Sequence, residues 1–243
     1  MRQYGLIGFP LTHSFSQKFF EEKFLKDGIT DAEFLSFSIA HISELNRIFK
    51  EYPLLKGLAV TIPYKKSVIE YVDEVSDIVK ETGACNCIRI TPGKKTGFNT
   101  DVTGFEMSFK KNLEPHHTNA LILGTGGAAA AVEYVLRKLR INYSFVSRAP
   151  AENRFAWQQI NKAVLEQFTV IINCTPLGTY PGIQEKPSLP YEFLTPKHYL
   201  FDLVYNPPLT SFLSEGKNHN CVVQNGYEML VIQAEENWKI WNA

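Results

Sequence analysis

Apolar residues recur along the chain at two spacings, and the spacing predicts where strands and helices lie. In the first part of the chain, apolar runs of strand length occur at residues 4–8, 33–38, 58–61 and 84–90. Apolar residues three or four positions apart predict helices after Ser16, over residues 41–51 and, with an interruption near Asp73, over residues 70–81. Helices alternate with strands here, which is typical of an α/β domain.

The same alternation continues after a polar break at Pro115-His116-His117-Thr118. The apolar runs predict strands at residues 119–123, 141–147, 168–173, 200–204 and 221–224. Helical spacing is found at residues 127–139, around 155–166, around 209–217, and from about residue 225 onwards. We therefore expect a domain junction between residues 100 and 118.

A glycine cluster separates the strand at residues 119–123 from the helix at residues 127–139, and it has the pattern G-x-G-x-x-A from Gly124 to Ala129. Gly124 permits a tight turn, Gly126 lets the backbone approach a pyrophosphate, and Ala129 lets the helix lie close to the strand. The helix N-terminus offers N–H groups and a positive dipole end to phosphates. The pattern favours dinucleotide binding over a tight connection without a ligand.

The next strand indicates which dinucleotide is bound, because it ends in Ser147-Arg148. An NAD site usually has an acidic residue in this region, which binds the ribose 2′-OH. A guanidinium at Arg148 would instead pair with a 2′-phosphate, which predicts NADP(H). The alternatives are an ordinary surface arginine, and an NAD site that uses the nearby Glu152.

Composition limits the classes of partner. The chain has 243 residues, of which 44% are hydrophobic, and its 25 basic and 25 acidic residues give no net charge. This balance argues against nucleic acid or an acidic membrane surface as the main partner. No signal peptide or membrane-spanning run is recognisable, so we expect a cytoplasmic protein without a membrane partner. The four cysteines and six histidines show no metal-ligand spacing, so no metal is expected.

Several polar residues in the first part of the chain are candidates for binding a small ligand. Ser14 and Ser16 follow the first strand, where their hydroxyls could bind a carboxylate or cap the next helix. Thr61 and Lys65 are expected where a strand meets a helix, the usual place for ligand groups in open α/β sheets. Asn86 within a predicted strand would need polar partners. Asp101 could bind a ligand or cap a helix.

Taken together and in this order, these residues and the glycine turn resemble the shikimate dehydrogenase family. The matching blocks are His13-Ser14-Phe15-Ser16, Val60-Thr61-Ile62-Pro63-Tyr64-Lys65, Gly83-Ala84-Cys85-Asn86, Asn99-Thr100-Asp101-Val102-Thr103-Gly104, Gly124 to Ala128, Asn173-Cys174-Thr175-Pro176-Leu177-Gly178, Asp202-Leu203-Val204-Tyr205-Asn206-Pro207 and Gly226-Tyr227-Glu228-Met229-Leu230-Val231-Ile232-Gln233. They span nearly the whole chain.

The resemblance implies an enzyme that reversibly reduces 3-dehydroshikimate to shikimate with NADPH, in the pathway to chorismate and the aromatic amino acids. It assigns to the substrate Ser14, Ser16, Thr61, Lys65, Asn86, Asp101, Tyr205 and Gln233. It assigns to the cofactor Gly124, Thr125, Gly126, Gly127, Ala128, Ser147, Arg148, Leu203, Gly226 and, from the first domain, Asp77. The small-molecule substrate is the expected partner, and the sequence leaves the oligomeric state open.

The resemblance also implies a fold class: an N-terminal α/β substrate domain and a Rossmann-like doubly wound dinucleotide-binding domain. We expect the substrate domain at residues 1–101, completed by the C-terminal helix at 225–243, and the NADP-binding domain at 102–224. The helix has to return because Gln233 belongs with Thr61 and Asn86 in the substrate set.

The residue types suit this chemistry. Carbonyl reduction builds negative charge on oxygen, which the ammonium of Lys65 can stabilise while it donates the proton. Asp101 can orient Lys65 or accept a hydrogen bond from a substrate hydroxyl. We therefore expect Lys65 and Asp101 to be the catalytic pair. Two alternatives stay open: a quinate/shikimate dehydrogenase that uses NAD or NADP, and a non-catalytic nucleotide-binding regulator with the same fold.

Overall fold

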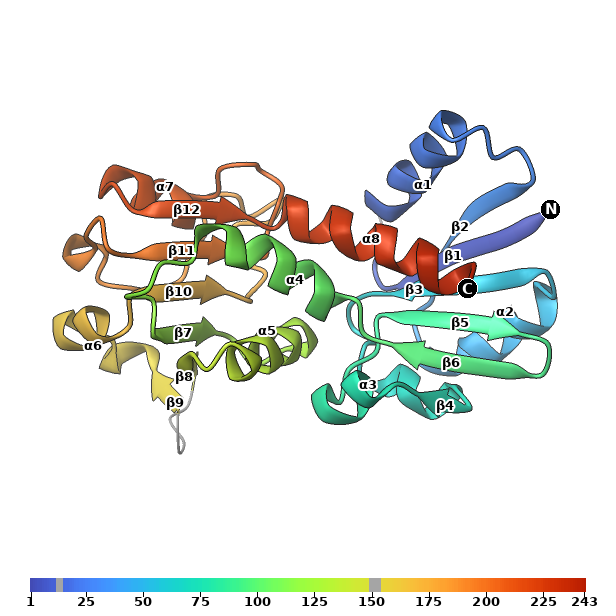
Figure 1. Ribbon diagram of the computed structural model, residues 1–243, viewed down its shortest axis with the longest axis horizontal. Coiled ribbons are helices and arrows are strands. Elements are labelled where there is room, and N and C mark those ends of the chain that lie inside the picture. The colour runs from blue at the N-terminus through green and yellow to red at the C-terminus, as the bar shows by residue number, and fades with distance from the viewer. Residues whose placement is uncertain (12–14, 149–153) are drawn as a thin grey trace. The chain divides into compact units, whose positions relative to one another are not determined.

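The computed structural model describes residues 1–11, 15–148 and 154–243 (Figure 1). The chain forms two compact units, of which the first contains Met1–Thr103 and Val231–Ala243, and the second Gly104–Leu230. Each unit is built on a six-stranded sheet. The predicted α/β fold class is therefore confirmed, including the return of the C-terminal helix to the first unit.

The sheet of the first unit is mixed, with the strand order β2-β1-β3-β5-β6-β4. Its strands are β1 (Arg2–Gly8), β2 (Ala32–Ser38), β3 (Leu55–Val60), β4 (Glu74–Val75), β5 (Cys87–Thr91) and β6 (Lys94–Phe98). Its helices are α1 (Phe15–Lys26), α2 (Leu45–Glu51) and α3 (Asp77–Thr82), with the 3₁₀ turns η1 (Ile42–Glu44) and η2 (Ser67–Tyr71). Strands β1, β2 and β3 pair in parallel, whereas β5 pairs antiparallel with β3 and β6.

The C-terminal helix α8 (Tyr227–Trp241) completes the core of the first unit. Tyr4 and Ile7 on β1 belong to different core clusters, as expected where side chains alternate across a strand. On the face with Tyr4, the aromatic residues of α1 pack with Trp241, whose ring stacks on Tyr4 at 5.3 Å between centroids. A Cβ at Gly57 would lie 2.2 Å from the Trp241 ring, so glycine makes room for the returning helix.

The sheet of the second unit has the order β12-β11-β10-β7-β8-β9, and all its strand pairs are parallel. Its strands are β7 (Asn119–Leu123), β8 (Asn142–Ser147), β9 (Arg154–Ala156), β10 (Val170–Asn173), β11 (Tyr199–Asp202) and β12 (Val222–Asn225). Its elements also include α5 (Gly127–Lys138), α6 (Lys162–Gln167), α7 (Ser211–Asn218), η3 (Lys110–Asn112), η4 (Trp157–Gln159) and η5 (Tyr191–Phe193). This is the strand order of a doubly wound sheet. Successive strands are added on one side of β7 up to β9, and from β10 onwards they are added on the other side, so the strand order reverses between β7 and β10.

Helix α4 (Asp101–Phe109) contains the junction between the two units, at Thr103 and Gly104. Helix α8 contains the return, at Leu230 and Val231. None of the helices in the described part of the chain is both long and apolar enough to span a membrane.

Three local predictions were wrong. The interrupted helix at residues 70–81 is instead η2, the short strand β4 and α3, because Glu74 and Val75 pair with β6. Arg154–Ala156 form the edge strand β9 by pairing with β8, where the start of a helix was expected. Asn86 lies just before β5 and not inside the strand.

Candidate active site

Lys65 and Asp101 form an ion pair in which Lys65 Nζ lies 2.6 Å from Asp101 Oδ2. Lys65 lies in the turn after β3, where its carbonyl oxygen accepts a hydrogen bond from the backbone N–H of Cys85. Asp101 is the first residue of α4. The side chains are only 15% and 8% exposed, so water screens the pair less than it screens a surface ion pair.

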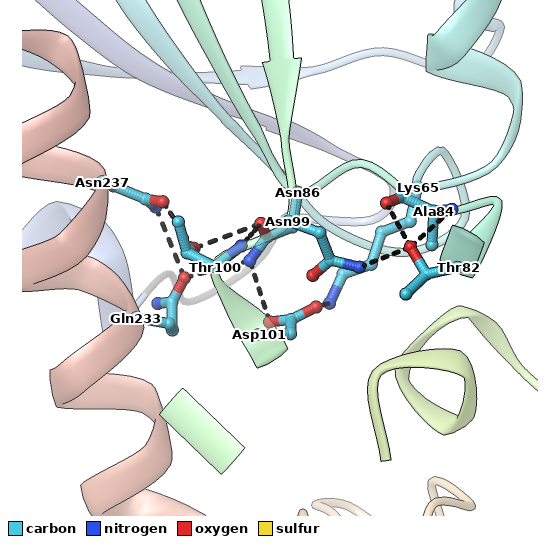
Figure 2. A network of polar contacts seen from close by, with 9 residues as sticks. All are labelled: Lys65, Thr82, Ala84, Asn86, Asn99, Thr100, Asp101, Gln233 and Asn237. Atoms are coloured by element: carbon cyan, nitrogen blue, oxygen red, sulfur yellow. Dashed lines mark hydrogen bonds and ion pairs between the residues drawn. The ribbon is translucent and has the colours of Figure 1, made fainter. Parts of the chain in front are cut away.

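Asn86 connects this pair to the C-terminal helix (Figure 2). Its Nδ2 donates to Asp101 Oδ1 at 2.9 Å and to Gln233 Oε1 at 3.4 Å, while its Oδ1 accepts the backbone N–H of Thr100 at 2.7 Å. The backbone of Asn86 is also held, because its N–H donates to Phe98 and its carbonyl accepts from Val60. The carboxamide is therefore a structural hub that fixes the carboxylate of Asp101 from the side opposite Lys65.

The structure thus brings Lys65, Asn86, Asp101 and Gln233 together in the first unit. Thr61 directly follows β3, and its N–H donates to the Ile7 carbonyl near the end of β1. Two further predicted substrate residues, Ser16 and Tyr205, lie on other elements. Ser16 is buried in α1, Tyr205 follows β11 in the second unit, and Ser14 lies outside the described residues.

The network also contains three polar residues to which the sequence analysis assigned no role: Asn99, Thr100 and Asn237. The hydroxyl of Thr82 donates to the Ile78 carbonyl at 2.7 Å, so it accepts from Asn99 Nδ2 at 3.1 Å. The Asn99 oxygen is buried without a hydrogen-bond partner within the described part of the chain. Asn99 and Thr100 directly precede Asp101 in the sequence, and this position could have indicated that they belong to the same site. Asn237 lies four residues after Gln233 on one helix, and this spacing could have indicated that the two side chains are neighbours.

The glycine turn of the second unit has the geometry expected for a phosphate-binding loop. Gly124 has φ +98°, which favours glycine, and a Cβ there would lie 3.1 Å from the Thr175 side chain. Gly126 caps the twelve-residue helix α5, and a Cβ at Gly126 would meet no atom within 4 Å. Since the N–H groups of a first helical turn lack intrahelical acceptors, the exposed loop suits a pyrophosphate.

The other predicted cofactor residues of this unit follow neighbouring parallel strands. Ser147 ends β8 and Arg148 follows it, next to the glycine turn, because the Gly124 N–H donates to the Val146 carbonyl at 2.9 Å. Leu203 follows β11 and Gly226 follows β12. A Cβ at Gly226 would lie 2.2 Å from the Leu203 carbonyl oxygen, so these two segments pack backbone to backbone. The predicted cofactor residues of this unit therefore all lie at or just after the carboxyl ends of its strands.

Asp77, the predicted cofactor residue of the first unit, begins α3 and is fully exposed. It forms an ion pair with Lys80 at 2.8 Å, and this hydrogen bond lowers the pKa of the Asp77 carboxyl. Glu152, the acidic residue of the NAD alternative, lies outside the described residues.

Asp202, the last residue of β11, is a buried carboxylate that ties the end of β10 to the loop after β11. Its oxygens accept from Asn173 Nδ2 at 2.9 Å, the Val204 N–H at 3.0 Å and the Thr210 hydroxyl at 2.6 Å. Burial raises the pKa of Asp202 to about 6, against the lowering effect of these hydrogen bonds. Asp202 belongs to a sequence block that was singled out, but its own role was not anticipated.

A doubly wound nucleotide-binding unit, joined to a unit with a lysine–aspartate pair held by amides, is typical of a two-domain dehydrogenase that uses a nicotinamide cofactor. Comparison with known proteins gives the family. Residues 6–88 match the family model of the shikimate dehydrogenase substrate binding domain. The chain is 37% identical to the NADP(+) shikimate dehydrogenase of Clostridium beijerinckii, covering 99% of this chain and 92% of that protein.

A relative from Methanococcus aeolicus with the same description is 32% identical, over 98% of this chain and 90% of its own length. Among solved structures, the Thermus thermophilus shikimate 5-dehydrogenase in complex with NADP(H) and shikimate superimposes with a TM-score of 0.87. It is 27% identical and is matched over 99% of this chain and 93% of its own. The chain belongs to the shikimate dehydrogenase family, as its sequence blocks predicted.

Proposed function

We propose that this protein is a shikimate dehydrogenase that reversibly reduces 3-dehydroshikimate to shikimate with NADPH. The observation that carries the proposal is the Lys65–Asp101 ion pair, held at 2.6 Å beside the carboxamides of Asn86 and Gln233. Family membership supports it, since the relatives named above are NADP(+) shikimate dehydrogenases. We place the reaction in the pathway to the aromatic amino acids and, as a prediction, in the cytoplasm.

Lys65 supplies the proton. A nicotinamide cofactor, when bound, would supply the hydride for the carbonyl carbon of the substrate. Lys65 Nζ gives its proton to the carbonyl oxygen, which becomes the hydroxyl of shikimate, and takes a proton back in the reverse direction. Because Asp101 Oδ2 holds the ammonium and Asn86 holds Asp101 Oδ1, the donor is positioned before the substrate arrives.

The surrounding hydroxyls and amides suit a substrate with one carboxylate and several hydroxyl groups. We assign Ser14, Ser16 and Thr61 to the substrate, with Asn86, Gln233 and Tyr205. Hydroxyls and carboxamides both donate and accept hydrogen bonds, so they can distinguish the substrate from an analogue that lacks a hydroxyl. These assignments rest on the family blocks and on the positions of the described residues in the two units.

The glycine turn would hold the pyrophosphate with the N–H groups of residues 124–128. Arg148 would pair with the 2′-phosphate, which favours NADP(H) over NAD(H). We assign Ser147, Leu203 and Gly226 to the same cofactor, and Asp77 from the first unit.

The test is to follow NADPH or NADP absorbance with 3-dehydroshikimate, shikimate and quinate, each also with the NAD couple. We expect turnover with shikimate and NADP, and weaker turnover with quinate or NAD. Equal rates with quinate would favour a quinate/shikimate dehydrogenase. Cofactor binding without turnover of any of the acids would favour a non-catalytic regulator.

A further inference from the structure

Asp202 holds the backbone of the segment that carries Leu203. The Asp202 side chain is buried, and its Oδ1 accepts the backbone N–H of Val204 at 3.0 Å. The carbonyl oxygen of Val204 accepts the N–H of Gly226 at 3.2 Å. The N–H of Leu203 is also bound, because it donates to the backbone carbonyl of Asn173 at 3.0 Å. Leu203 therefore lies between two hydrogen-bonded backbone positions, and the carboxylate of Asp202 supplies one of these bonds.

The same carboxylate oxygen is connected to the glycine turn through Asn173 and Thr175. Asp202 Oδ1 accepts Asn173 Nδ2 at 2.9 Å, and Asn173 Oδ1 accepts the N–H of Thr175 at 3.0 Å. A carboxylate only accepts and a backbone N–H only donates, so the Asn173 amide has one orientation that satisfies both. The Thr175 side chain lies against the turn, since a Cβ at Gly124 would be 3.1 Å from it. One chain of contacts thus joins Asp202 to Gly124.

The second oxygen of Asp202 binds outside these segments. Oδ2 accepts the Thr210 hydroxyl at 2.6 Å, and Thr210 caps α7. Among the described residues no lysine, arginine or histidine pairs with the carboxylate, and burial raises its pKa. Burying a carboxylate without a cation is unfavourable. Its hydrogen bonds instead fix groups at the carboxyl ends of β10 and β11, beside the predicted cofactor residues.

We propose that Asp202 is a positioning residue for the nicotinamide cofactor, and that it holds Leu203, Gly226 and the glycine turn in the arrangement that binds NADP(H). The inference rests on the proposed function, which assigns these segments to the cofactor. Asp202 is 0% exposed, so it makes no cofactor contact and acts through Val204 and Asn173. A site whose segments are fixed in advance loses less conformational entropy when its ligand binds.

The experiment compares Asp202→Ala with Asp202→Asn by fluorescence titration with NADPH at pH 7.5. Alanine leaves the Val204 N–H and the Asn173 amide without this acceptor. We expect the dissociation constant for NADPH to rise roughly 5- to 50-fold, because the released segments must be ordered when the cofactor binds. In Asp202→Asn the amide oxygen can still accept both donors, and its NH₂ can donate to the Thr210 hydroxyl oxygen. Its dissociation constant should therefore stay within about threefold of the wild-type value.

Asn161→Ala is the matched control for lost stability, because Asn161 caps α6 in the same unit by accepting the Val164 N–H at 3.1 Å. It should lower the thermal unfolding temperature and leave the dissociation constant for NADPH unchanged. Hydrogen exchange of the protein without cofactor is a second readout. The Val204 amide should exchange faster in Asp202→Ala than in Asp202→Asn or Asn161→Ala. Asp202→Leu, which keeps a branched shape but accepts no hydrogen bond, replaces the alanine variant if that does not fold.

A wild-type dissociation constant for NADPH in folded Asp202→Ala would overturn the positioning role. Equal weakening in Asp202→Asn or in Asn161→Ala would also overturn it, because charge or overall stability would then explain the loss. These outcomes leave shikimate turnover by the wild-type protein intact. A wild-type protein that binds NADPH but does not turn over shikimate contradicts the proposed function, while the comparison of dissociation constants still decides the role of Asp202.

Discussion

The ammonium of Lys65 lies 2.6 Å from the carboxylate of Asp101, although 36 residues separate them in the chain. The turn after β3 carries the lysine, and the start of α4 carries the aspartate. Each residue is also held by a second hydrogen bond. The Cys85 N–H donates to the Lys65 carbonyl, and the Asn86 amide donates to Asp101 Oδ1. The pair is therefore fixed by backbone as well as by charge.

Replacing Lys65 by alanine should lower the turnover number for shikimate by about 10²- to 10⁴-fold, since the proton donor is lost. The Michaelis constant for shikimate should change far less, because the neighbouring hydroxyls and amides remain. Lys66→Ala is the matched control, as Lys66 is exposed and next in sequence. Near-normal turnover in Lys65→Ala, measured by steady-state kinetics, would mean that Lys65 is not the proton donor.

Asp101→Asn keeps the shape of the side chain but removes the charge that holds the Lys65 ammonium. We expect reduced turnover, and we expect the double variant with Lys65→Ala to be little worse than the worse single variant, because the two groups act as one unit. Steady-state kinetics of the four proteins tests this. Losses that multiply in the double variant would show that the two residues act separately.

Arg148→Leu should raise the Michaelis constant for NADPH roughly ten- to a hundredfold and leave that for NADH nearly unchanged, because a charged contact to phosphate contributes about 1.5–3 kcal/mol. Arg137→Leu, on an exposed position of α5, removes the same charge from the same unit as a control. An equal loss for both cofactors in Arg148→Leu would contradict recognition of the 2′-phosphate.

Gly126→Ala should leave stability nearly unchanged, because the backbone has φ −74° and a Cβ would meet no atom within 4 Å. If this backbone approaches the pyrophosphate, the added methyl group will weaken NADPH binding, which fluorescence titration measures. Gly226→Ala is the contrasting variant. Its Cβ would lie 2.2 Å from the Leu203 carbonyl oxygen, so it should destabilise the fold by about 1–3 kcal/mol. Unchanged NADPH affinity in Gly126→Ala would exclude close approach of the phosphates.

Asp202 should make stability depend on pH. Burial raises its pKa in the folded protein to about 6, above the value of about 3.9 in an unfolded chain. The folded state therefore holds its proton more tightly, and this contribution to stability is present below about pH 4 and lost as the pH rises through about 6. Asp202→Asn cannot ionise, so wild type should gain up to about 3 kcal/mol relative to it on going from pH 7.5 to 4. Urea unfolding of both proteins across this range checks it, and a difference independent of pH would contradict it.

The sequence by itself determined the fold class and the family, and it predicted the residues of the candidate site. The local patterns sufficed for this, because a buried strand, a glycine turn and an amphipathic helix each leave a recognisable spacing in the chain. The strand β7 was predicted with the bounds it has, Asn119–Leu123, and α5 to within one residue. Lys65 and Asp101 were predicted from motifs alone, and the structure joins them in an ion pair; their catalytic role stays a prediction.

Only the tertiary structure decided which polar groups meet and which way their amides face. The edge strands β4 and β9 form because neighbouring strands supply hydrogen bonds, which no local spacing reveals. Asn237 resembles any polar residue of a helix until α8 packs beside Thr100 and Asn86. Hydrogen bonds of this kind join residues more than a hundred positions apart. Their direction depends on all the donors and acceptors around them, so it is a property of the folded chain.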